Sequence, residues 1–413
     1  MKKLINLLFA FSFLSLIIAY LLGEDSLGGA KQDYLFYERF IENFAYDFLN
    51  TFKSYGGVEE YSVRNSPLYY IILSLFIKVG FTLTGIKYIN FLSIIFLFHA
   101  FYISLKEKYP KISIDTSILF LSAILFSPTI RSLLVWPYPF LWALILFLYS
   151  IYFYLKFCNS KNEYDKLKFA LKNIFFVALS SYFTPNFAIF SLYFFYNYFN
   201  IFNFNKLIII IFSNFILALP AFIYYFLKDF YVLSSNYPYP NLNLNLSNKI
   251  IIISSLLFFY FIPFIRLKEL YKRKPNFSFD LKFIFIVLFI IINIIFFDFI
   301  KNAGGGIFFH LSYLIFKSPI IIYLIFILYL YIMKTLNLFN FNNLTLFLIL
   351  IFFNIQYTIY HKYFDPLLLF IFLFLFNFNK KKIDTQIYSI SIKNIILYIC
   401  FLIISLGKSY INY

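Results

Sequence analysis

Charged residues are scarce in this chain of 413 residues, at 13%, while hydrophobic residues make up 62%. A soluble domain carries about 25% charged and about 45–50% apolar residues. The mean hydropathy of +0.81 agrees with that contrast. These values exclude a soluble enzyme, a secreted disulfide scaffold and a disordered chain. They predict an all-α integral membrane protein with many spans.

Cysteine and histidine are almost absent, with two and three copies. Cys158 lies beside a charged loop and Cys400 lies inside an apolar run, so we predict no disulfide. The three histidines are scattered and have no metal-ligand spacing. We therefore predict no metal site and no cofactor, and leave open a divalent cation held by carboxylates.

Acidic residues number 18 against 35 Lys and Arg, a net charge of +17. In a soluble chain this excess would suggest nucleic acid. In a membrane protein, Lys and Arg border the cytoplasmic ends of spans, so their placement predicts topology.

Thirteen apolar runs are candidate spans. The first follows Lys2 and Lys3, and no small-x-small cleavage site comes after it, so we expect an uncleaved span. The runs are 1–22, 88–105, 113–131, 138–156, 168–184, 186–204, 206–227, 249–266, 281–299, 319–333, 344–361, 363–378 and 391–407.

The run 67–84 is ambiguous, since it barely reaches the length of a span and contains Lys78. If it does not cross and the N-terminus is inside, 22 of the 35 Lys and Arg lie on the cytoplasmic side. If it does cross, about 24 of the 35 lie outside, against the positive-inside rule. We therefore predict a juxtamembrane helix on the outer side. The first outer loop, 23–87, is then the longest connection and holds eight of the eighteen acidic residues.

Within this loop, residues 32–52 have Phe36, Phe40, Phe44 and Phe48 at a spacing of four, which predicts one amphipathic helix on the membrane surface. The Gly28-Gly29 pair before it permits a sharp reversal of the chain. Asp33 falls in the first turn, where it is either a helix cap or a catalytic carboxylate.

The motifs of the first 200 residues carry a resemblance to a known family. An acidic residue and an amphipathic helix follow the first span, then come Arg64-Asn65-Ser66-Pro67-Leu68, Ser127-Pro128-x-x-Arg131 and Trp136-Pro137-Tyr138. This order resembles GT-C glycosyltransferases, in particular the bacterial relatives of protein O-mannosyltransferases and aminoarabinose transferases. Beyond residue 200 only His361-Lys362-Tyr363 through Leu367 is similar. The chain departs from the family where Tyr34 replaces a frequent Glu and where the Pro-Leu segment has no His.

The resemblance implies a single transmembrane domain over 1–413 that transfers a sugar, with inversion, from a polyprenyl-phosphate donor on the periplasmic side. It implies a carboxylate as general base. Asp33 is our first choice, with Asp25 and Glu24 as alternates. Cations at the outer surface would bind the donor phosphate, or would simply contact lipid headgroups. The candidates are Arg64, Arg131, Lys317 and Lys362.

A further outer segment, 301–318, contains three consecutive glycines, Gly304, Gly305 and Gly306. We interpret it as a flexible loop that could cover a lipid-linked substrate. His310 lies in the same segment, and His361 and Tyr363 flank Lys362. Each of these side chains either contacts substrate or lies at the membrane interface.

Three other classes stay open: a multi-span transporter or flippase, an O-antigen-type glycan polymerase, and a structural membrane protein. A transporter usually carries ionisable residues in mid-membrane, and the central parts of the predicted spans have none but His99. A polymerase usually has a late, Arg-rich outer loop. The partners expected are a polyprenyl-phosphate sugar, a lipid, glycan or protein acceptor and the bilayer, with no nucleic acid. The expected location is a bacterial inner membrane with the N-terminus in the cytoplasm.

Overall fold

The computed structural model describes residues 2–26, 28–55, 66–228, 245–265, 281–299, 304–354, 356, 358–378 and 383–411. Within these residues every regular element is helical, which confirms the predicted all-α class. Six helices are long and apolar enough to cross a membrane, or seven if one bent pair counts as a span. A chain with this many such helices is a multi-pass membrane protein.

The chain forms two compact units, residues 1–237 with 384–413 and residues 238–383. The helices of the first unit are α1 Lys2–Leu22, α2 Ala30–Tyr46, α3 Phe48–Ser54, α4 Leu68–Lys78, α5 Leu83–Leu92, α6 Ile94–Lys108, α7 Ile114–Leu125, α8 Pro128–Val135, α9 Pro139–Asn159, α10 Glu163–Phe183, α11 Phe190–Phe199, α12 Phe204–Leu227 and α21 Ile387–Ile411. Those of the second unit are α13 Leu246–Phe261, α15 Leu281–Ile295, α16 Gly306–Phe316, α17 Ile320–Thr335, α18 Phe341–Phe353 and α19 Leu367–Phe370.

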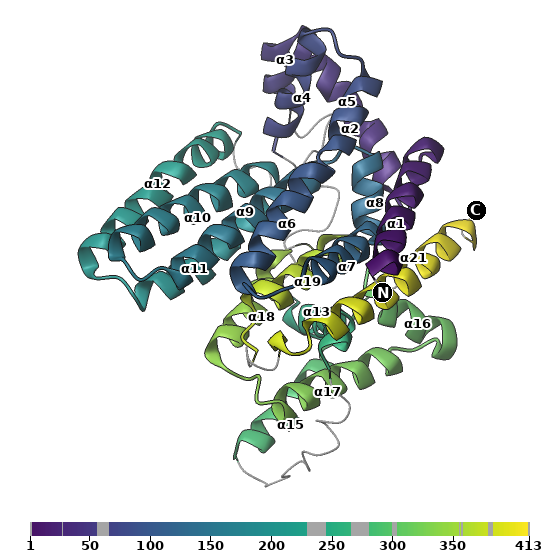
Figure 1. The fold of residues 1–413 in the computed structure, drawn as a ribbon, viewed down its shortest axis with the longest axis vertical. Coiled ribbons are helices and arrows are strands. Elements are labelled where there is room, and N and C mark those ends of the chain that lie inside the picture. The colour runs from purple at the N-terminus through teal and green to yellow at the C-terminus, as the bar shows by residue number, and fades with distance from the viewer. Residues whose placement is uncertain are drawn as a thin grey trace. The chain divides into compact units, whose positions relative to one another are not determined.

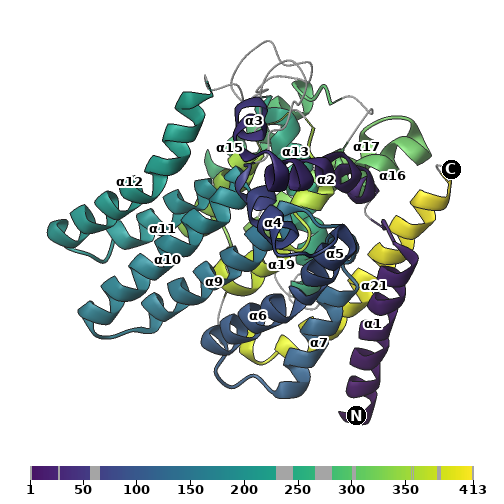
Figure 2. The ribbon, with the colours of Figure 1, turned by 90° about the horizontal axis from the view of Figure 1, so that it is seen from above.

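The long helices of the first unit form its membrane part. Helix α7 contacts α1 and α21, and α9 contacts α6 and α10. Figures 1 and 2 show α9, α10, α11 and α12 side by side. Helix α12 presents mostly exposed apolar side chains, as expected of a lipid-facing helix.

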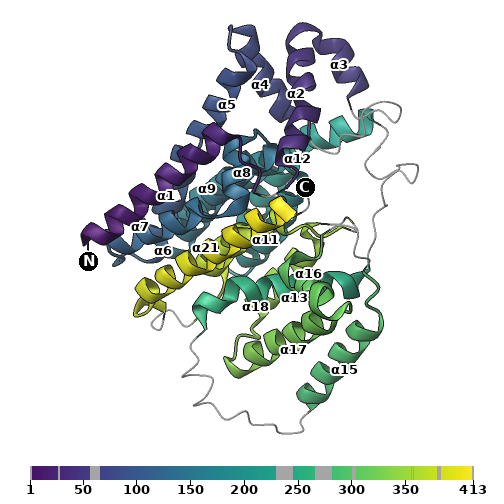
Figure 3. The ribbon, with the colours of Figure 1, turned by 90° about the vertical axis from the view of Figure 1, so that its right-hand side faces the viewer.

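Helices α2 to α5 gather beyond the C-terminal end of α1 (Figure 3). Helix α4 has 11 residues, a length of about 16 Å, whereas the hydrocarbon core is about 30 Å thick. Helix α4 is thus shorter than the helices that qualify as candidate spans; that the run 67–84 stays outside the membrane core, and on its outer side, remains a prediction.

The single amphipathic helix predicted over 32–52 is wrong, because the chain breaks at Asp47. The Asp47 side chain accepts a hydrogen bond from Asn50 N at 3.4 Å and starts α3 as its N-cap. The predicted buried face is correct at Phe40 and Phe44, but Phe36 is 41% exposed. The end of α3 is held from another part of the unit, since Lys228 Nζ donates to the carbonyls of Phe52 at 2.6 Å and Lys53 at 2.7 Å.

The predicted span 113–131 bends instead of running straight. Helices α7 and α8 meet at 68°. Ser127 caps α8 by accepting from Ile130 N at 3.1 Å, and Pro128 occupies the first turn. Each of the other predicted runs also contains helix, but several of these helices have 10–17 residues. Caps and prolines therefore divide apolar runs that composition alone presents as continuous.

In the second unit α13 is the central helix and contacts α15, α16, α17, α18 and α19. Lys249, in the first turns of α13, is buried and donates to the carbonyl of Asn354 at 2.9 Å. Asn354 is the C-cap of α18. The Lys249 ammonium therefore stabilises the carbonyl end of a neighbouring helix, where a cation is favourable.

Candidate functional site

The start of the loop that follows α1 is joined to α8 by a buried ion pair. Arg131 Nε donates to Glu24 Oε1 at 2.8 Å, and Nη2 donates to Glu24 Oε2 at 2.7 Å. The Arg131 side chain is 4% exposed and the Glu24 side chain 15%. Since this geometry is bidentate, it fixes orientation as well as charge. From the sequence we expect Glu24 as an alternate base and Arg131 as a phosphate ligand. In the structure their charges neutralise each other.

Further hydrogen bonds complete this lock. Arg131 also donates to the hydroxyl of Ser15 at 3.0 Å and to its carbonyl at 3.1 Å. Trp136 Nε1 donates to the carbonyl of Glu24 at 3.1 Å. Ser26 Oγ donates to the carbonyl of Pro128 at 3.1 Å. The lock thus joins α1, the first residues of the loop and α8, and it holds the Trp136 ring in place.

Asp25 has a structural role at the start of α2. Its carboxylate accepts from the backbone N–H groups of Gly29, Ala30 and Lys31 at 2.8, 3.2 and 3.2 Å. Gly28 and Gly29 both have positive φ, 74° and 101°. The sharp reversal predicted for the glycine pair is confirmed, and Asp25 caps the helix that follows it.

Asp33 lies in the first turn of α2 and is partly exposed. The helix N-terminus favours a carboxylate there. Asp33 N donates to the carbonyl of Gly29 at 2.9 Å. Its assignment as a base stays a prediction.

A cation that sequence reasoning did not single out lies over two aromatic rings. Lys87 Nζ is 4.5 Å from the centre of the Trp136 ring and 4.8 Å from that of Tyr34. Lys31 Nζ lies 5.7 Å from the same Trp136 ring. Among the described residues Lys87 makes no hydrogen bond or ion pair, so cation–π attraction positions its ammonium group.

Glu38 faces this cation from α2. Burial raises the pKa of the Glu38 carboxyl above its ordinary value, Lys87 lowers it in part, and Glu42 raises it further. Glu38 has no hydrogen bond or ion pair to any part of the chain that the structure describes. The carboxylate and the Lys87 ammonium thus interact without touching.

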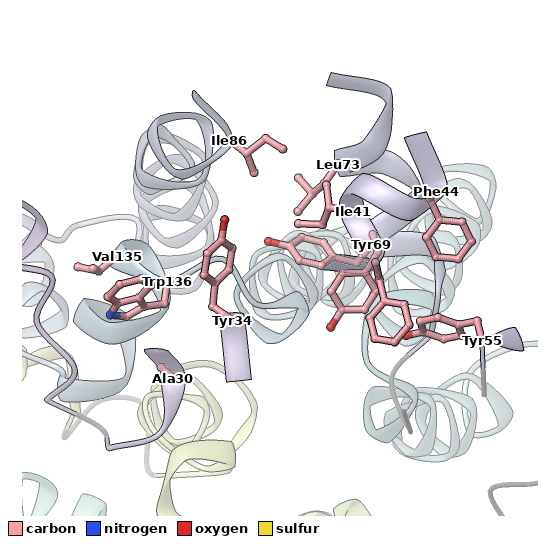
Figure 4. Close-up of a cluster of buried hydrophobic side chains, with 12 residues drawn as sticks. Ala30, Tyr34, Ile41, Phe44, Tyr55, Tyr69, Leu73, Ile86, Val135 and Trp136 are labelled. Carbon is pink, nitrogen blue, oxygen red and sulfur yellow. The ribbon is translucent and has the colours of Figure 1, made fainter. Parts of the chain in front are cut away.

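The Tyr34 hydroxyl is the third member of this cluster. Tyr34 is 1% exposed, and its hydroxyl finds no hydrogen-bond partner within the described ranges. Burial raises the pKa of Tyr34 well above its ordinary value, and Glu38 and Glu42 raise it further. Figure 4 shows the ring between Trp136 and Tyr69, with the oxygen turned away from Ala30. The hydroxyl therefore keeps its proton and is a buried donor without an acceptor.

We call Tyr34, Glu38, Lys87 and Trp136 the Lys87 cluster. Tyr34, Glu38 and Glu42 follow one another at a spacing of four on α2, so they share a helix face. This spacing is the one feature of the sequence that could have indicated a shared polar face. The sequence could not reveal that Lys87 and Trp136, from α5 and the end of α8, meet the same face.

The second unit contains the remaining predicted residues. Gly304, Gly305 and Gly306 all have positive φ, and Gly305 N donates to the carbonyl of Ile359 at 2.9 Å. A Cβ at Gly304 would lie 2.7 Å from Ile359 O, and one at Gly306 would lie 2.7 Å from Leu256 Cδ2. The expected flexible loop is wrong for these three residues, which are glycines because the chain turns in close contact with its neighbours.

His361 is partly buried, and its Nε2 lies 2.8 Å from the Tyr260 hydroxyl. Burial, together with His310, lowers the pKa of His361 to about 3. The Lys362 ammonium lies 5.5 Å from the Tyr360 ring and 5.8 Å from the Tyr363 ring. The second unit thus brings His310 close to His361, with Lys362 and Tyr363 next along the chain.

Lys317 ends α16 in the left-handed region, at φ 50°. Arg64 lies outside the described residues. No group of three metal-ligating side chains occurs in the part of the chain that the structure describes.

No protein family, curated protein or solved structure matches this chain in sequence or fold.

Proposed function

We propose that the chain is a GT-C-type membrane glycosyltransferase that moves a sugar from a polyprenyl-phosphate donor to an acceptor on the outer side, with inversion. The observation that carries the proposal is the Lys87 cluster under the first loop. It combines a cation that forms no ion pair within the described residues, a carboxylate of raised pKa and a buried hydroxyl donor. These are the groups that transfer from a phosphate leaving group needs.

The proposal gives each group a chemical task. Lys87 stabilises the charge that develops on the leaving phosphate, since an ammonium held away from water interacts strongly with an anion. A carboxylate of α2 accepts the proton of the attacking hydroxyl or amine. The order of motifs along the first 200 residues supports the same class.

The proposed topology places the N-terminus in the cytoplasm and the chain in a bacterial inner membrane. A transporter is the alternative function. The buried cation Lys249, near the end of a long apolar helix, would favour transport. Lys249 instead donates to the carbonyl of Asn354 and so caps a helix.

The test is a transfer assay in membranes. Undecaprenyl phosphate esters of radiolabelled glucose, mannose, galactose and aminoarabinose are supplied in turn, and donor consumption is measured. Lys87→Met should raise KM for the active donor at least about tenfold, equivalent to about 1.4 kcal/mol of lost binding. Lys78→Met is the matched control, because Lys78 is an exposed lysine of the neighbouring helix. Consumption of none of the four donors by the wild type would overturn the proposal.

A further inference from the structure

The structure limits which carboxylate of the first loop can act as a base. Glu24 is held by Arg131 in a bidentate ion pair. Asp25 accepts three backbone hydrogen bonds at the start of α2. Both carboxylates are therefore already engaged with groups of the protein rather than turned to a substrate. The two alternates that the sequence offered are thus parts of the scaffold.

We propose that Glu38 is the catalytic base of this chain, and that the acceptor hydroxyl or amine lies between Glu38, the Tyr34 hydroxyl and Lys87. The assignment rests on the proposed function, since it names the base of that reaction. Glu38 has no hydrogen bond or ion pair within the described chain, so its carboxylate is free to face a substrate.

The neighbours of Glu38 indicate where the substrate lies. The Tyr34 hydroxyl is buried and has no acceptor, although Glu38 and Glu42 lie close enough to raise its pKa. Such a donor is costly to bury, and a polar substrate atom would satisfy it. Lys87 faces the same carboxylate from α5 and marks the position of an anion. Acceptor and donor phosphate can therefore meet in one place.

The chemical step is balanced. As the acceptor oxygen or nitrogen forms its bond to the anomeric carbon, its proton passes to a Glu38 oxygen. The bond between the anomeric carbon and the phosphate oxygen breaks, and its electron pair stays on the phosphate. Lys87 stabilises the polyprenyl phosphate that leaves, and Tyr34 donates a hydrogen bond to the acceptor. Glu38 then releases its proton to water.

The surroundings suit a general base. The charged and titratable groups that face Glu38 are Lys87 from α5 and Glu42 and Tyr34 from its own helix. Burial, with a smaller contribution from Glu42, raises the pKa of Glu38 against the lowering effect of Lys87, which makes the carboxylate a better proton acceptor.

The experiment separates binding from transfer. Glu38→Gln, Glu38→Asp, Asp33→Asn and Glu42→Gln are compared with the wild type for donor consumption and for binding of undecaprenyl phosphate. Glu42→Gln is the matched control, because Glu42 lies one turn further along α2 and is exposed. Folding is checked by thermal unfolding in detergent.

Glu38→Gln should lose about a hundredfold or more in kcat while it binds undecaprenyl phosphate as tightly as the wild type or more tightly. Glu38→Asp should keep part of the activity, and Glu42→Gln most of it. The acid limb of the wild-type pH profile should disappear in the residual activity of Glu38→Gln.

Two results would overturn the assignment and leave the proposed function intact. One is an active wild type with an equally active Glu38→Gln. The other is loss of transfer in Asp33→Asn alone, which would return the base to Asp33. An inactive wild type is a different outcome, because it removes the proposed function and the assignment together.

Discussion

At the residue scale, the Lys87 cluster is held together by aromatic rings more than by complementary charges. Lys87 lies over Tyr34 and Trp136, and its carboxylate neighbour Glu38 stays out of contact. Within the part of the chain that the structure describes, a cation, a carboxylate and a hydroxyl lie in one place without ion pairs or hydrogen bonds to their side chains, which is typical of functional sites.

The Tyr34 hydroxyl provides the first prediction at this scale. Tyr34→Phe should raise the free energy of unfolding by about 1 kcal/mol, because it removes a buried donor that has no acceptor. The same change should lower donor consumption. Thermal unfolding in detergent and the transfer assay measure the two effects. Tyr46→Phe is the control, since Tyr46 lies on the same helix and is 83% exposed. A less stable Tyr34→Phe protein would mean that the hydroxyl has a partner.

His361 provides a prediction of pH dependence. Its pKa is lowered to about 3 in the fold, against 6.5 for an ordinary histidine. Between these two values the unfolded chain binds a proton that the folded chain does not, so stability is lost as the pH falls below 6.5. The slope is up to about 1.4 kcal/mol per pH unit.

The measurement is thermal unfolding of wild type and His361→Gln from pH 7 to pH 4. The glutamine variant should show a shallower loss of stability toward low pH. Equal slopes for the two proteins would contradict the role of His361.

At the element scale, two helices of this protein are ended by side chains from distant segments. Lys228 holds the carbonyl end of α3, and Lys249 holds that of α18. Short helices are marginal by themselves. The Lys228 contacts therefore explain why α3 persists with 7 residues.

The ion pair between Glu24 and Arg131 yields a prediction about elements, since it joins the loop to the bend between α7 and α8. Arg131→Met should destabilise the protein by about 3–5 kcal/mol, because it leaves the Glu24 carboxylate buried without its partner. The double variant Glu24→Gln with Arg131→Met should be less destabilised than Arg131→Met. Chemical unfolding in detergent measures both. A double variant that loses the sum of the two single effects would show that the residues act independently.

At the scale of the whole molecule, the bend between α7 and α8 decides the topology. With the helices bent by 68°, the pair is either a broken span or a re-entrant loop. The positive-inside distribution predicts a crossing, which places Tyr46 outside and Tyr164 inside.

Cysteine labelling tests this topology. Cys158 and Cys400, both exposed, are first replaced by serine. Tyr46→Cys and Tyr164→Cys are a matched pair, with exposures of 83% and 72% in the parent residues. A membrane-impermeant maleimide should label position 46 in intact cells and position 164 only after permeabilisation. Labelling of both positions from the same side would mean that α7 and α8 re-enter the membrane without crossing it.

The amino-acid sequence by itself determined the class of the protein and the outline of its first loop. Long apolar runs can only be helices in a bilayer, because no water satisfies backbone groups there. The Gly28-Gly29 reversal and the short helix after Pro67 followed from local conformational rules of the same kind. Such rules act between neighbours in the chain, and a sequence displays them directly.

Only the tertiary structure decided which side chains meet. Glu24 forms an ion pair with Arg131, which lies more than a hundred residues further along the chain. Lys87 of α5 lies over the ring of Trp136, at the end of α8. It also showed that Gly304 to Gly306 are packed, and that Asp47 divides a run of helical periodicity. These outcomes depend on burial and on partners distant in the chain, which change the energy of a charge or a hydroxyl without changing the local sequence pattern.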